Sequence, residues 1–65
     1  MREDHANVVV RNQSQFAANR LKAWCAANSA DLFLVGVDGG YSGYVALPNR
    51  EKVSEVINIV RSSMN

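Results

Sequence analysis

Residues 32–37 form an uninterrupted apolar run, LFLVGV, that ends at Asp38-Gly39-Gly40. The run is too short for a helix and is followed by glycines, so it predicts a strand that leads into a tight hairpin turn. Side chains alternate between the two faces of a strand, and here both sets are apolar. A sheet with one face in water would carry polar residues at every second position. Both faces of this strand therefore need cover, either from the chain itself or from a partner.

Two further strands are expected. Residues 7–11 include three consecutive valines and predict the first strand of the chain. Residues 44–47 predict the strand that returns after the hairpin turn, and Pro48 ends it because proline has no backbone N–H to donate.

Two helices complete the pattern. Residues 14–28 are rich in alanine and contain neither glycine nor proline, which predicts a helix with Asn12 as its N-cap. Residues 50–63 predict a second helix with Asn49 as its N-cap. Its apolar face is expected to consist of Val53, Val56, Ile57, Val60 and Met64, with Ile59 lying off this face.

The element order β-α-β-β-α predicts a two-layer α+β domain, in which a three-stranded sheet carries both helices on one face. The strand order stays open, because the first strand can pair parallel with the second or antiparallel with the third. Residues 1–65 are expected to form a single domain, with residues 1–6 as a frayed N-terminal tail.

With both helices on one face, the opposite face of the sheet is apolar and uncovered, which is typical of an association surface. A domain of about 60 residues also buries only about 60 % of its unfolded surface. We therefore expect a homodimer or a protein partner that closes over the sheet or continues its edge. The alternative is a monomer with one helix on each face. The residues expected to bind a partner are Phe33, Val35 and Val37 on the sheet, Phe16, Arg20 and Trp24 on the flank of the first helix, and Tyr41 and Tyr44 at the tip of the hairpin loop.

Catalytic chemistry is not expected. The glycine-rich segment joins two strands, so it matches neither a phosphate-binding loop nor the strand-to-helix elbow that would make Ser42 a nucleophile. His5 lies in the predicted tail, and Cys25 falls on the apolar stripe of the first helix as a small hydrophobic residue. With one histidine and one cysteine, no zinc site is expected either. The sequence thus predicts a protein that is not an enzyme and holds no metal or other cofactor.

Charge and targeting signals narrow the class of partner. Seven Lys and Arg residues balance six Asp and Glu residues without a block of one sign, which disfavours a dedicated nucleic-acid binder. A single cysteine, no signal peptide and no apolar run of membrane-spanning length indicate a cytoplasmic protein that does not enter a membrane.

These observations favour a small protein–protein interaction module that acts as a dimer, in the manner of bacterial or phage-type regulators and inhibitors. The first alternative is a nucleic-acid-binding module that uses Arg11, Arg20 and Lys22 together with the loop tyrosines. The second alternative is a small-molecule sensor at a dimer interface, because the β-α-β-β-α order is similar to part of the ferredoxin-like ligand-binding domains. That resemblance rests on element order alone.

Overall fold

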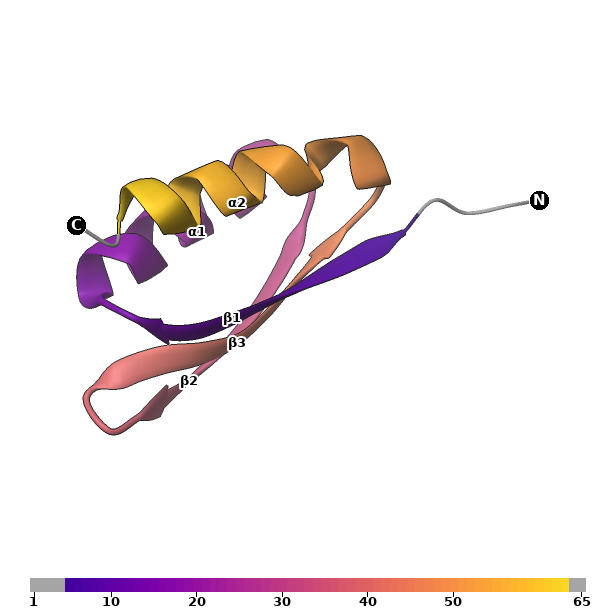
Figure 1. Ribbon diagram of the computed structural model, residues 1–65. Coiled ribbons are helices and arrows are strands. Elements are labelled where there is room, and N and C mark those ends of the chain that lie inside the picture. Colours follow the sequence, from indigo (N-terminus) through magenta and orange to yellow (C-terminus); the bar gives the residue numbers. More distant parts are fainter. Residues whose placement is uncertain (1–4, 64–65) are drawn as a thin grey trace.

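The computed structural model describes residues 5–63, which form a three-stranded sheet and two α-helices. The elements are β1 (Ala6–Gln13), α1 (Gln15–Ala27), β2 (Asp31–Val37), β3 (Gly40–Leu47), a single 3₁₀ turn (Arg50–Lys52) and α2 (Val53–Ser62). Both helices lie on the same face of the sheet (Figure 1), which confirms the predicted two-layer α+β domain. None of the described helices is long and apolar enough to cross a membrane.

The central strand is β3, and the spatial order is β1-β3-β2 with both pairings antiparallel. The first strand therefore pairs with the third, and α1 connects β1 to β2 across the central strand. The hairpin turn consists of Asp38 and Gly39, both with positive φ (51° and 83°), as a type I′ turn requires. Such a two-residue turn places β3 directly beside β2.

The start of α1 differs from the sequence prediction. Strand β1 continues to Gln13 through an irregularity after Val10, where Asn12 has a φ of 57° and its N–H donates to Ser42 Oγ at 3.0 Å. Asn12 is thus part of the strand and does not cap the helix. The N-cap is Ser14, whose Oγ accepts from the N–H of Ala17 at 3.1 Å.

Ala6, the last residue of the predicted N-terminal tail, belongs instead to β1 and pairs with Leu47. Residues 1–4 of the predicted tail lie outside the described residues, as does Met64 on the predicted face of the second helix.

The second helix begins three residues later than the sequence predicts, at Val53. Asn49 caps the preceding 3₁₀ turn instead, where its side-chain oxygen accepts from the N–H of Glu51 at 3.0 Å. The buried face of α2 is also rotated from the prediction. Ile59 packs against the core and Ile57 remains 40 % exposed. Glu55 lies one turn before Ile59 on the same side of α2, and its Oε1 accepts from Trp24 Nε1 at 3.1 Å, so this side of α2 faces α1.

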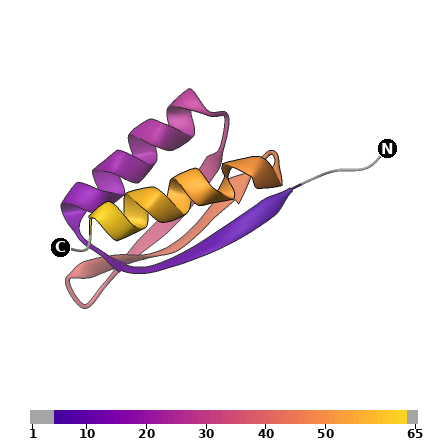
Figure 2. The same ribbon diagram turned by 45° about the horizontal axis from the view of Figure 1, so that its top comes forward.

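The two helices converge at the end where α1 begins and α2 ends (Figure 2), and Arg20 Nη1 donates to Ser62 Oγ at 3.0 Å there. The core lies between the helices and the sheet. It consists of Val10, Leu21, Cys25, Val45, Leu47 and Val56.

Candidate protein-binding surface

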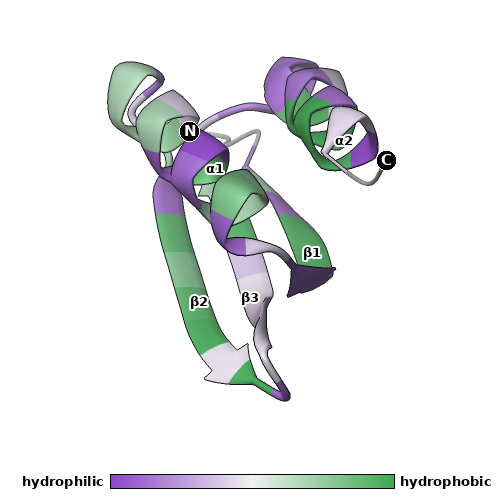
Figure 3. Ribbon diagram, turned by 90° about the vertical axis from the view of Figure 1, so that its left-hand side faces the viewer, coloured by the Kyte–Doolittle hydropathy of each residue, from purple (hydrophilic) through white to green (hydrophobic). Residues whose placement is uncertain are grey.

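The face of the sheet away from the helices carries five large exposed side chains, which we call the open face. Val9, Tyr44 and Phe33 lie in one row across the three strands, and Val35 and Val37 extend this row along β2. Their exposed fractions are 66 % for Val9, 54 % for Phe33, 49 % for Val37, 45 % for Val35 and 44 % for Tyr44. Figure 3 shows that most of β2 is hydrophobic. The open face is therefore a continuous apolar surface rather than a set of scattered residues.

An aromatic pair lies at the centre of the open face. The rings of Phe33 and Tyr44 are stacked, with centroids 5.6 Å apart and an interplanar angle of 30°. The residues are cross-strand partners, and pairs of this kind stabilise a sheet and restrict the rings. The open face thus presents a rigid aromatic centre, which suits the binding of another surface.

The backbone of β2 approaches β3 so closely at Gly43 that no side chain fits there. A Cβ atom at Gly43 would lie 1.8 Å from the carbonyl oxygen of Phe33. The glycine therefore sets the position of Phe33 beside Tyr44. Only the pairing of β2 with β3 reveals this packing role of Gly43.

Val9 also belongs to the open face, although the sequence analysis did not include it among the residues expected to bind a partner. The signal that would have identified it is the alternation of β1, because Val8 packs against the core and Val10 is buried, whereas Val9 between them is the most exposed of the three valines.

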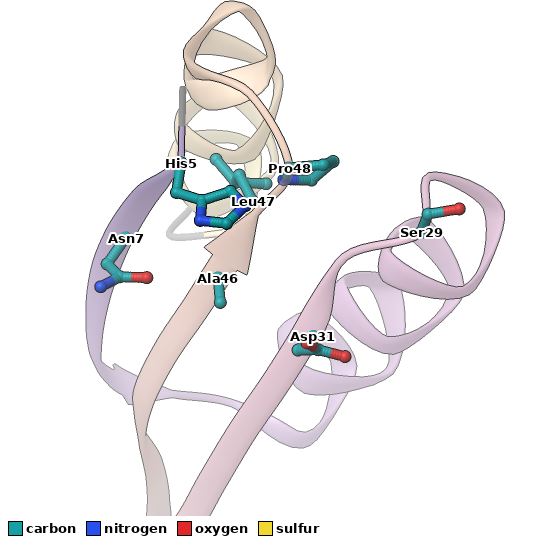
Figure 4. Close-up of a pocket in the computed structure, with 7 residues that line it drawn as sticks. All are labelled: His5, Asn7, Ser29, Asp31, Ala46, Leu47 and Pro48. Carbon is teal, nitrogen blue, oxygen red and sulfur yellow. The ribbon is translucent and has the colours of Figure 1, made fainter. Parts of the chain in front are cut away.

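One end of the open face is hollowed. Asn7, Ala46 and Asp31 lie side by side across the three strands, and with His5 and Pro48 they line a cavity of about 300 Å³ (Figure 4). Asp31 brings a negative charge to this end of the sheet face.

The predicted residues of the sheet, Phe33, Val35 and Val37, all lie on the open face. The predicted residues of the helix flank lie in the other layer and do not join them. Phe16 is exposed on α1 with the Arg20 guanidinium 5.7 Å from its ring centroid. Trp24 is half-buried against the core, and its indole N–H donates a hydrogen bond to Glu55 of α2.

The predicted location of the two tyrosines in a loop is wrong. Strand β3 begins at Gly40, so Tyr41 and Tyr44 both belong to the strand. They are three positions apart and therefore lie on opposite faces of the sheet. Tyr44 is on the open face, whereas the Tyr41 hydroxyl donates to Gln15 Oε1 at the start of α1, at 2.6 Å.

The basic residues of the nucleic-acid alternative are spread over two layers. Arg20 and Lys22 lie on α1 with the helices, and Arg11 lies in β1. Of the three, Arg11 alone lies in the sheet with Tyr44, so the structure does not bring all three together with that tyrosine on one surface.

Cys25 is a buried free thiol on α1. Burial raises its pKa above the ordinary value of 9.0, and the negative charge of Asp31 raises it further. The unfolded chain therefore loses this proton at a lower pH than the folded one, so the thiol contributes stability at neutral pH that is lost as the pH rises through the folded pKa.

This shift predicts a pH-dependent effect of Cys25→Ala. The loss of unfolding free energy caused by the substitution is expected to be smaller at about pH 10 than at about pH 7.5. At high pH the thiol of the unfolded wild type is ionised and must take up a proton to be buried, which lowers the stability of the wild type but not that of the variant. Urea unfolding of both proteins at the two pH values measures it. A loss that is equal at both pH values would contradict the assignment.

Within residues 5–63, no group of three or more His, Cys, Asp and Glu side chains is placed to hold a metal ion. Comparison of the chain with protein-family models, with curated proteins and with solved structures found no match.

Proposed function

We propose that this protein is a small interaction module that binds another protein chain through the open face, in the manner of regulators and inhibitors that act as dimers. The observation that supports the proposal is the continuous apolar row on the helix-free side of the sheet, in which all five large side chains are at least 44 % exposed. Together these five side chains expose on the order of 400 Å² of surface. A protein interface of standard size has about 450 Å² of apolar surface on each partner.

The composition of the open face supports binding rather than catalysis. Its centre consists of hydrocarbon and aromatic side chains, and the Tyr44 hydroxyl is the polar group among them. The Cys25 thiol is buried in the other layer, with a raised pKa that disfavours the reactive thiolate. We therefore propose a non-enzymatic role, and a cytoplasmic location in which this thiol stays reduced.

The proposal predicts selective capture by the open face. Wild-type protein, Val35→Glu and the control Ala26→Glu are immobilised and exposed to the same cell extract. The control adds the same charge at an exposed position of α1. A bound protein is expected on the wild type and on the control, with at least about tenfold less on Val35→Glu, because a carboxylate in a desolvated apolar interface is strongly unfavourable.

Two results would contradict the proposal. One is a wild type that neither self-associates nor retains a protein. The other is a set of retained proteins that is the same for all three baits, which would place binding elsewhere on the molecule.

A further inference from the structure

Two opposite charges lie at diagonal corners of the open face. Asp31 is the first residue of β2 and is level with Ala46 and Asn7 across the sheet. Arg11 is four residues beyond Asn7 on β1, at the start of the irregularity between Val10 and Gln13. Its exposed side chain directly follows the buried Val10, which places it on the open side of the sheet with Val9. Strand spacings place the Cα atoms of Arg11 and Asp31 about 16 Å apart.

Tyr44 lies at the midpoint of this diagonal. It pairs with Val9, two residues before Arg11, and with Phe33, two residues after Asp31. The two charges are therefore placed symmetrically about Tyr44. Arg11 lies two residues beyond the partner of Tyr44 on β1, and Asp31 lies two residues before its partner on β2.

This arrangement is complementary to itself. A two-fold axis through Tyr44, parallel to the sheet and perpendicular to the diagonal, exchanges the two charged corners. In a face-to-face pair, Arg11 of each copy then lies opposite Asp31 of the other, and the two Tyr44 rings meet on the axis. Contacts that occur twice in this reciprocal way are the signature of a two-fold dimer. The strands of the two sheets cross steeply, near the orthogonal class of sheet packing.

Neither charged side chain has an ion-pair partner among residues 5–63, and both are exposed. Both are thus available to a second molecule. The apolar area also suffices, because two open faces together bury about 800 Å² of apolar surface, as much as the apolar part of an interface of about 1,400 Å².

We infer that the partner of the open face is a second copy of the chain, packed across a two-fold axis at Tyr44 with reciprocal Arg11–Asp31 contacts. The inference rests on the proposed function, since it names the partner of the same surface.

A charge exchange tests the arrangement. Arg11→Asp and Asp31→Arg each turn two attractive contacts of the dimer into two repulsive ones, so each is expected to raise the dimer dissociation constant at least about tenfold at low salt. The double variant exchanges the charges and is expected to return to within about threefold of wild type. The control Glu51→Lys changes an exposed charge on the 3₁₀ turn and is expected to have no effect.

Sedimentation equilibrium at about 0.02 M and about 0.5 M salt measures these constants, and the effect of each single variant is expected to shrink at the higher salt. A wild-type sample with half of its molecules isotope-labelled provides a readout that needs no variant. In that sample a nuclear Overhauser contact is expected between Tyr44 rings of different copies.

Single variants without effect, a double variant as weak as either single variant, or no contact between Tyr44 rings would each overturn the two-fold arrangement. If Val35→Glu nevertheless dissociates the dimer, the open face keeps its role as the binding surface. A wild type that stays monomeric overturns the second copy as partner, and the capture experiment then tests the proposed function by itself.

Discussion

Gly43→Ala is expected to abolish the native fold. The added Cβ would lie 1.8 Å from the carbonyl oxygen of Phe33 and 3.0 Å from the Cα of Leu34, and both atoms belong to the backbone of the neighbouring strand. Backbone in a paired strand cannot move aside without breaking the ladder between β2 and β3. We expect a loss of more than about 3 kcal/mol, which is most of the stability of a domain this small. Circular dichroism and urea unfolding measure it.

Gly36→Ala is the matched control, because it makes the same chemical change in the same hairpin. A Cβ at Gly36 meets only the carbonyl oxygen of Gly40, at 3.9 Å, which is an ordinary contact. Its free energy of unfolding is expected to stay within about 1 kcal/mol of wild type. A folded Gly43→Ala variant with the stability of Gly36→Ala would show that the two strands do not approach each other as described.

Val35→Glu is expected to raise the dissociation constant of the proposed dimer at least about 100-fold while leaving the monomer intact. Val35 is 45 % exposed on the open face and lies opposite Ser42, so the substitution removes little from the core. In the dimer, two carboxylates would be desolvated among apolar side chains, which costs several kcal/mol. Sedimentation equilibrium gives the dissociation constant. Urea unfolding at a protein concentration below that constant gives the stability of the monomer.

Ala26→Glu again serves as the control, since it adds the same charge on the exposed side of α1. It is expected to associate as the wild type does. If Val35→Glu instead unfolded at a much lower urea concentration than the control, its loss of association would reflect damage to the fold, and the open face would lose its support.

The local features of the sequence were sufficient to predict the elements and part of the open face. The apolar run at residues 32–37 and the turn at Asp38 and Gly39 predicted β2 with Phe33, Val35 and Val37 on one side, because strand alternation and positive φ are local properties. Asn49 likewise marked the end of the extended segment and the start of the 3₁₀ turn that leads into α2, because capping involves neighbouring residues only.

Features that depend on contacts between distant residues were not predictable. The row of Val9, Tyr44 and Phe33 exists only because β1 and β2 both pair with β3, and the sequence left this order open. The packing role of Gly43 follows from the same pairing. Tyr41 was predicted in a loop because the length of β3 is set by its partner strands rather than by its own glycine-rich sequence.

The molar mass in solution tests most directly whether a second copy covers the open face. Light scattering on the wild type over a concentration series is expected to give a mass that rises from 7.1 kDa toward twice that value. Val35→Glu is expected to remain at 7.1 kDa over the same series. A wild type that stays at the monomer mass throughout, or a Val35→Glu variant whose mass rises as the wild type's does, would contradict the proposed role of the open face in self-association.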